Sequence, residues 1–202
     1  MLKVGLTGGL ASGKSTVAAR LREHGLPVLD ADLVVRELYA PGGAGAAAIS
    51  STYGPELLGE DGAVDRPKLA ALVFGDPEAV AKLNALIHPL VHRAQADWFH
   101  ELESNGKGIG VVEATLLIES GGRSRFDVLV TVSAPASVRL ERAVARGGNR
   151  DDLAKRIAAQ MPDEAREKVA DIVLRSTGSK DDLLRDADDL ADRLKRMAFH
   201  GA

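Results

Sequence analysis

The 202-residue sequence contains no cysteine, and aromatic residues make up only 3% of it. The absence of cysteine excludes disulfides, thiolate metal sites and a cysteine nucleophile. No apolar run is long enough to span a membrane, because the first one, residues 2–6, is interrupted by Lys3 and followed by glycines. No block of basic residues occurs and the formal net charge is -3, which argues against nucleic acid as the main partner. We therefore expect a cytoplasmic protein that binds small molecules and neither a membrane nor nucleic acid.

Apolar residues account for 45% of the chain and charged residues for 27%, as in ordinary globular proteins. Short runs rich in Val, Leu and Ile alternate with stretches in which apolar residues recur at helical spacing. This pattern is typical of the α/β class and predicts a five-stranded parallel sheet flanked by helices. The strands are expected at residues 2–7, 27–30, 109–113, 128–133 and 171–174. The first helix is expected over residues 14–24, ended by Gly25.

The connection formed by residues 33–107 is far longer than the roughly dozen residues that a crossover between parallel strands needs. We interpret it as a helical insertion that holds the ligand, in a single domain whose core is residues 1–32 and 108–202. A second, smaller excursion over about residues 147–160 begins with two glycines and predicts a mobile lid. Within the long insertion, helices are expected near residues 66–74, 76–87 and 90–104.

The first predicted strand runs directly into the sequence GGLASGKS, residues 8–15, which matches the phosphate-binding pattern GxxxxGKS in the required strand–loop–helix setting. Backbone N–H groups of such a loop bind phosphate oxygens at the start of the following helix. Lys14 would contact the β- and γ-phosphates, and the Ser15 hydroxyl would contact the accompanying Mg²⁺. The alternative is a glycine turn that only caps a helix. The other residues expected to bind ATP in this loop are Gly9, Ala11, Ser12, Gly13 and Thr16.

A phosphate loop also occurs in GTPases and motors, but no guanine-reading NKxD segment follows a later strand here, which favours a kinase. A kinase of small molecules needs a carboxylate beside the acceptor hydroxyl. Asp30 and Asp32 follow the second predicted strand, at the sheet edge where ligands bind, and Asp32 is our candidate base. The alternative is that Asp32 only caps the helix that follows it.

Three arginines, Arg139, Arg142 and Arg146, are spaced to share one face of a helix after the fourth predicted strand. Guanidinium groups can clamp phosphates, and we favour Arg142 and Arg146 for this task. For Arg139 we favour a solvated position paired with Glu141 and nearby acids.

Two carboxylates, Glu113 and Glu119, flank the exit of the third predicted strand. Each of them could contact magnesium through water or bind the substrate. The alternative for each is an ordinary surface carboxylate. His88 precedes Pro89, which is more typical of a residue that ends a helix than of a catalyst.

Taken together, these residues resemble the dephospho-coenzyme A kinase family over nearly the whole chain. The resemblance extends beyond the phosphate loop to several motifs in the same order. These motifs are GLTGGLASGKST at 5–16, DAD at 30–32 followed by Arg36, NALIHP at 84–89, LLIE at 116–119, RLERAVAR at 139–146, RIAAQMP at 156–162 and AD at 170–171.

The resemblance implies transfer of the γ-phosphoryl group of ATP, with Mg²⁺, to the ribose 3′-hydroxyl of dephospho-CoA. It implies that Asp32 is the base and that Thr7 and Arg142 lie at the active site. It also implies a substrate-binding role for His88 and Arg36, and we add Glu119 to that group. The sequence leaves the oligomeric state open.

Four positions depart from the family pattern: Ala11 replaces a glycine, Glu113 an aspartate, Thr115 a proline and Ser176 an asparagine. The Ala11 backbone is therefore expected to avoid conformations that are costly for a residue with a Cβ atom. Two alternatives stay open, a kinase of another nucleotide or small metabolite, and a nucleotide-binding module without transfer activity.

Overall fold

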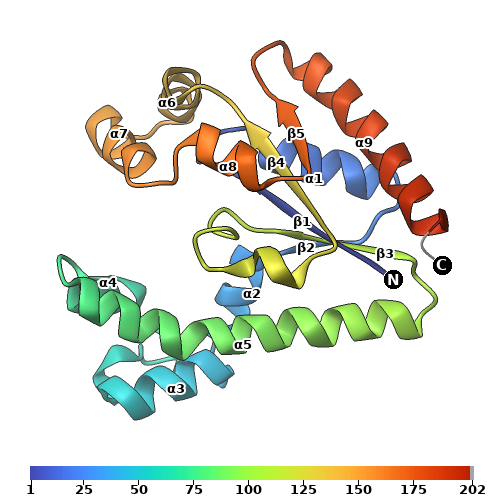
Figure 1. Cartoon of the computed structure of the whole chain (residues 1–202). Coiled ribbons are helices and arrows are strands. Elements are labelled where there is room, and N and C mark those ends of the chain that lie inside the picture. The colour runs from blue at the N-terminus through green and yellow to red at the C-terminus, as the bar shows by residue number, and fades with distance from the viewer. Residues whose placement is uncertain (201–202) are drawn as a thin grey trace. The chain divides into compact units, whose positions relative to one another are not determined.

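The computed structural model describes residues 1–200, which form two compact units. The first unit comprises Met1–Leu29 together with the chain from Glu101 onward, and the second comprises Asp30–His100. The phosphate loop and the parallel sheet belong to the first unit (Figure 1).

The sheet has five strands in the order β2-β3-β1-β4-β5, and the predicted α/β class is confirmed. β1 lies between β3 and β4 and pairs in parallel with both, so the strand that precedes the phosphate loop is central. β4 also pairs in parallel with the edge strand β5. The bounds are β1 Leu2–Gly8, β2 Val28–Asp30, β3 Ile109–Glu113, β4 Val128–Ser133 and β5 Ile172–Arg175.

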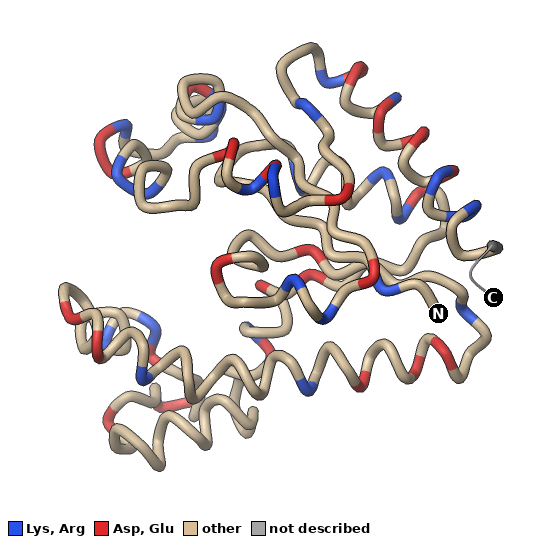
Figure 2. Tube along the Cα trace, viewed as in Figure 1, with Lys and Arg blue, Asp and Glu red and all other residues tan. Residues whose placement is uncertain are grey.

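One face of the sheet is covered by α1 (Lys14–Glu23) and α9 (Lys180–His200), which also contact each other. Alternate strand residues such as Val4 and Leu6 point to this face, as the two-residue period of a strand requires. Acidic and basic residues are mixed along α9 (Figure 2). The main core gathers here, from Val17, Ala18 and Leu21 of α1, Leu183, Ala187, Leu190, Ala191 and Leu194 of α9, and the facing strand residues.

The other face of the sheet is contacted by α8 (Asp163–Val169), which follows α6 (Ala136–Ala145) and α7 (Arg150–Ala158). The sequence pattern predicts helices over residues 135–146 and about 151–160, which correspond to α6 and α7, but it predicts no helix at α8. The reason is that the buried side chain of α8 is Arg166, so the helix has no apolar stripe to reveal it. A short 3₁₀ helix, Gly122–Arg125, lies between β3 and β4.

The second unit is helical, as expected for the insertion, and contains α2 (Ala31–Leu38), α3 (Ala44–Tyr53), α4 (Arg66–Val73) and most of α5 (Pro77–Ser104). A 3₁₀ turn, Pro55–Leu57, connects α3 to the following segment. α3 was not predicted because its sequence, AGAAAISSTY, offers small side chains and little apolar contrast.

α5 is one continuous helix, so the predicted break between two helices at His88–Pro89 is wrong. A proline inside a helix removes one N–H bond to the carbonyl four residues earlier. The buried stripe Ile87, Val91, Gln95 and Phe99 nevertheless keeps a four-residue spacing across Pro89, and this packing maintains the helix.

No helix in residues 1–200 is long and apolar enough to cross a membrane.

Candidate active site

The phosphate loop spans the turn between β1 and α1 and contains the residues predicted to bind ATP. The Ser12 N–H donates to the Gly9 carbonyl at 3.1 Å, which closes the turn. Gly13 caps α1 with φ 105°, in the region that favours glycine. The backbone therefore favours glycine here, and a Cβ atom at Gly13 would lie 2.7 Å from Leu183 Cδ2, so that side chain would have to shift.

Ala11 adopts φ 58° and is the one non-glycine residue with positive φ in the described chain. The expectation that its backbone avoids a costly conformation is therefore wrong. The left-handed region brings Cβ close to the following carbonyl oxygen, at a cost of about 1–2 kcal/mol for an L-residue.

Lys14, Ser15 and Glu113 converge at the start of α1. One carboxylate oxygen of Glu113 accepts a hydrogen bond from Lys14 Nζ at 2.8 Å and another from Ser15 Oγ at 2.9 Å. Glu113 follows Ile109 and Val111 on the α1 side of β3 and is only 4% exposed. The sequence left Glu113 between a functional and a surface position, and its burial rules out the surface position.

These oxygens fit Mg²⁺. The ion prefers oxygen ligands and usually takes one or two from protein, with the others from phosphates and water. Ser15 Oγ and the buried Glu113 carboxylate provide such a pair beside the phosphate loop. Within residues 1–200 no group of three or more His, Cys, Asp or Glu side chains is arranged to hold a metal. An ion held largely by nucleotide oxygens therefore suits the site better than one in an all-protein cage.

Arg142 lies against the phosphate loop and the segment after β5. Its guanidinium donates to Ser176 Oγ at 2.9 Å and to the Ser176 carbonyl at 3.0 Å. Its third contact is the Ser12 carbonyl of the loop at 3.5 Å. Ser176, one of the departures from the family pattern, is thus the residue that anchors Arg142. Arg146 is exposed just beyond α6.

Arg139 is 2% exposed, so the expectation of a solvated arginine paired with Glu141 is wrong. Its guanidinium donates to the Ala134 carbonyl at 3.1 Å and to Asp163 at 2.9 Å. Glu141 instead pairs with Arg150. The error arises because ionic partners distant in sequence can bury an arginine, and helical spacing does not reveal them.

Thr7 and Glu119 lie on the other side of the sheet from α1. Thr7 is fully buried, and its hydroxyl donates to the Thr115 carbonyl at 3.2 Å. Glu119 accepts a hydrogen bond from Arg166 at 2.8 Å, and Arg166 itself is 1% exposed. The structure thus links Thr7 to the segment after β3 and links Glu119, within that segment, to α8.

The remaining predicted residues, Asp32, Arg36 and His88, belong to the second unit. The alternative that Asp32 caps the helix is wrong, because Asp30 is the N-cap and accepts from the Asp32 N–H at 2.8 Å. Asp32 and Arg36 are exposed and four residues apart on α2, hence on one face. His88 lies inside α5 and stacks on His92 with ring centroids 6.0 Å apart, so it does not end a helix.

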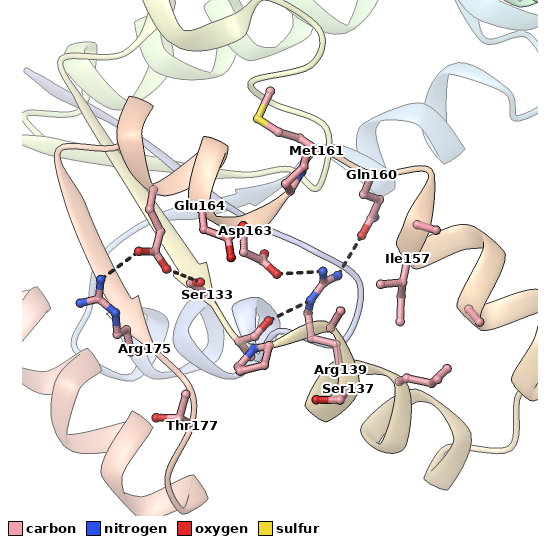
Figure 3. Close-up of a pocket in the computed structure, with 18 residues that line it drawn as sticks. Ser133, Ser137, Arg139, Ile157, Gln160, Met161, Asp163, Glu164, Arg175 and Thr177 are labelled. Atoms are coloured by element: carbon pink, nitrogen blue, oxygen red, sulfur yellow. Dashed lines mark hydrogen bonds and ion pairs between the residues drawn. The ribbon is translucent and has the colours of Figure 1, made fainter.

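A pocket of about 650 Å³ lies among β4, α6, α7 and α8 (Figure 3). Its wall includes Arg139, Gln160 and Asp163, which are joined by hydrogen bonds. Glu167 bridges Ser133 and Arg175 on another side of the pocket. No residue of the phosphate loop lines it.

A family model described as dephospho-CoA kinase matches residues 2–182. A dephospho-CoA kinase of Corynebacterium glutamicum is 41% identical over 199 residues, covering 98% of this chain and 100% of the relative. One from Streptomyces avermitilis is 42% identical over 200 residues, covering 97% and 96%. The similarity therefore extends over both units and not only over the phosphate loop.

Solved structures agree with these matches. The crystal structure of TT1252 from Thermus thermophilus has a TM-score of 0.81 and 38% identity, covering 96% of this chain and 97% of that one. Dephospho-CoA kinase from Campylobacter jejuni shares the fold, with a TM-score of 0.65 at 21% identity and coverage of 95% and 96%. The phosphate loop, the strand order and the nearly full-length matches lead to one assignment: the chain belongs to the dephospho-CoA kinase family.

Proposed function

We propose that this chain transfers the γ-phosphoryl group of ATP to the ribose 3′-hydroxyl of dephospho-CoA, yielding coenzyme A in the last step of its synthesis. The observation that carries this proposal is the convergence of Lys14, Ser15 and Glu113 at the phosphate loop of a chain in this family. Phosphoryl transfer depends mainly on positioning and on compensation of negative charge, which is what such a cluster provides.

Backbone N–H groups from Gly9 to Thr16 and the Lys14 ammonium group bind the phosphates of ATP. Glu113 holds Lys14 and Ser15 in place before the nucleotide arrives. Ser15 Oγ and Glu113 would hold Mg²⁺, which supplies positive charge to the phosphate oxygens. Arg142, anchored by Ser176, and the exposed Arg146 add positive charge on the side of α6.

Several predicted residues act on the acceptor in this proposal. Asp32 accepts the proton of the 3′-hydroxyl. Its carboxylate is exposed and does not cap α2, so it is available for that step. Arg36, His88 and Glu119 bind the substrate, and Thr7 takes part in catalysis. A lid over about residues 147–160 closes over ATP and excludes water, which prevents hydrolysis without transfer.

The test is a coupled assay of ADP formation with Mg²⁺ and ATP, comparing dephospho-CoA, nucleoside monophosphates, adenosine and no acceptor. ADP formation that requires dephospho-CoA and yields coenzyme A supports the proposal. Activity with another acceptor alone would show a different kinase, and no acceptor-dependent turnover would favour a binding module.

The Asp32→Asn variant tests the base, with Asp30→Asn as its matched control. Asn caps a helix about as well as Asp, so Asp30→Asn keeps α2 intact while changing the same charge two residues away. We expect Asp32→Asn to lower kcat by about 100-fold or more with little change in ATP affinity, and Asp30→Asn to lower it far less. Near-normal turnover of Asp32→Asn would remove Asp32 as the base.

A further inference from the structure

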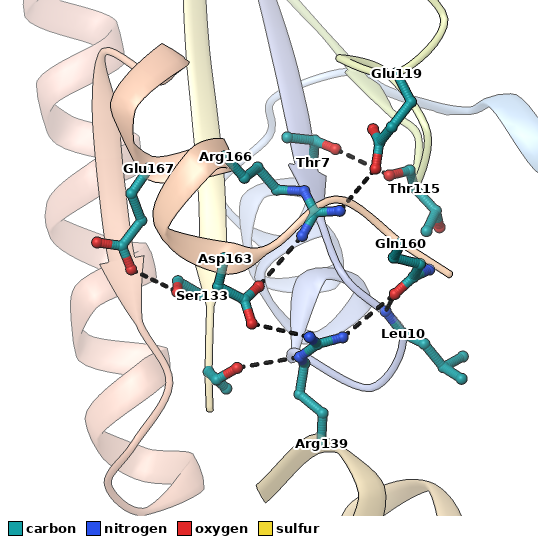
Figure 4. Close-up of polar contacts among 11 residues, drawn as sticks. Thr7, Leu10, Thr115, Glu119, Ser133, Arg139, Gln160, Asp163, Arg166 and Glu167 are labelled. Carbon is teal, nitrogen blue, oxygen red and sulfur yellow. Dashed lines mark hydrogen bonds and ion pairs between the residues drawn. The ribbon is translucent and has the colours of Figure 1, made fainter. Parts of the chain in front are cut away.

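The phosphate loop is held by a side chain from the segment between α7 and α8. Gln160 Oε1 accepts a hydrogen bond from the Leu10 N–H at 2.9 Å and another from Arg139 Nη1 at 3.2 Å (Figure 4). Both partners are obligate donors, so the carbonyl oxygen of the amide must face them. One oxygen atom thus joins the first half of the phosphate loop to α6.

Arg139 is a rigid support for Gln160. It is 2% exposed, and its Nε and Nη2 atoms are held by the Ala134 carbonyl and by Asp163. The guanidinium also lies directly against Gly9, where a Cβ atom would meet Nη1. Arg139 therefore contacts the loop both by packing at Gly9 and through Gln160 at Leu10.

The support continues to the segment after β3. Asp163 accepts from Arg166 at 3.2 Å, and Arg166 donates to Glu119 at 2.8 Å (Figure 4). Two arginines and two carboxylates alternate, so their charges cancel inside the fold. A buried network of this kind holds its members in fixed positions when every charge is paired.

We propose that Gln160 is a positioning residue for phosphoryl transfer, fixing the Leu10 end of the phosphate loop and coupling it to the segment between α7 and α8. This role rests on the proposed function, in which the loop binds ATP. Leu10 lies between Gly9 and Ala11, whose backbone is strained. Without the Gln160 oxygen, ATP binding would also have to order this part of the loop.

The key variant is Gln160→Met, which keeps the length of the side chain and removes the acceptor. Loss of one hydrogen bond that orders the loop is expected to weaken ATP binding by about three- to tenfold. The KM for dephospho-CoA should stay within about twofold, because the change acts on the phosphate loop. Met161→Leu, a volume-conserving change at the next position, is the matched control and should leave ATP binding unchanged.

Three measurements distinguish positioning from general damage. Calorimetry gives the Kd of ATP, a steady-state assay gives the KM of dephospho-CoA, and NMR gives the exchange rate of the Leu10 amide in the nucleotide-free protein. We expect faster Leu10 exchange in Gln160→Met. Gln160→Glu retains an acceptor for Leu10 and Arg139 and should restore slow exchange.

An ATP Kd within twofold of wild type in Gln160→Met would overturn the proposal. Equal weakening of both substrates with unchanged Leu10 exchange would overturn it as well. Calorimetry needs no acceptor, so the role of Gln160 can be judged even if wild-type protein fails to phosphorylate dephospho-CoA. That failure would refute the proposed function alone.

Discussion

Ala11→Gly is expected to raise the stability of the protein. Ala11 has φ 58°, and relieving an L-residue of the left-handed conformation is worth about 1–2 kcal/mol. The greater freedom of glycine in the unfolded chain offsets about 0.4–1 kcal/mol of that gain. Ala11 is only partly buried, so little packing is lost. At the middle of both ranges the net gain is about 0.8 kcal/mol, or roughly 2–3 °C in Tm for a chain of this size.

Thermal unfolding of the nucleotide-free protein measures this gain. The control is Ala19→Gly, an exposed position in the middle of α1 with ordinary helical backbone. Glycine there should lower stability by about 1 kcal/mol and therefore lower Tm. The two substitutions are chemically identical and should have opposite signs. An Ala11→Gly variant with an unchanged or lower Tm would refute the argument that the loop backbone is strained.

Two further predictions concern charged groups. Hydrogen bonds from Arg20 and His24 lower the pKa of Asp188 from 3.8 to about 2, so the stability it contributes is present above about pH 4 and is lost as the pH falls through 2. Denaturant unfolding between pH 5 and 2 should therefore show a smaller acid loss in Asp188→Asn, and parallel curves for the two proteins would contradict this. Glu113→Gln removes a charge that Lys14 and Ser15 contact, and it should raise the Mg²⁺ concentration for half-maximal rate by about tenfold. An unchanged Mg²⁺ titration would place Glu113 outside the metal site.

The sheet could be predicted because its strands are buried on both faces. Such strands appear as unbroken apolar runs, and VLVTV in β4 is one of them. The bounds predicted for β3 and β4 coincide with those observed. The phosphate loop could also be predicted, because its chemistry depends on residues that are contiguous in sequence.

Helices without an apolar stripe could not be predicted in this way. α8 buries Arg166, and α3 is built from alanine and glycine, so neither shows hydrophobic periodicity. A break is expected at Pro89 because proline removes one helical hydrogen bond, but that single loss does not end α5. In each case contacts with distant parts of the chain outweigh the local signal.

Site residues whose partners are distant in sequence were the hardest to place. The spacing correctly places Arg139 and Arg142 on one helix, but Arg146 lies beyond the end of α6. Only the fold shows that Arg139 is buried against Asp163. Gln160 belongs to the motif RIAAQMP, but its hydrogen-bond partner Leu10 is 150 positions away in sequence. Likewise, DAD at 30–32 contains two carboxylates. Only the structure shows that Asp30 is the N-cap, because its carboxylate accepts from the Asp32 N–H.

Three departures from local rules lie at the phosphate loop or directly against it. Ala11 occupies a left-handed conformation, the buried Ser12 hydroxyl has no hydrogen-bond partner, and Arg139 is buried against Gly9. Each feature lowers stability, and each is maintained by the surrounding core. A loop that curls its N–H groups into one concavity cannot satisfy all of its own polar groups. The shape of the loop therefore explains why Arg139 and Gln160 support it. A strained phosphate loop needs rigid contacts, and here an ionic network provides them rather than an apolar core.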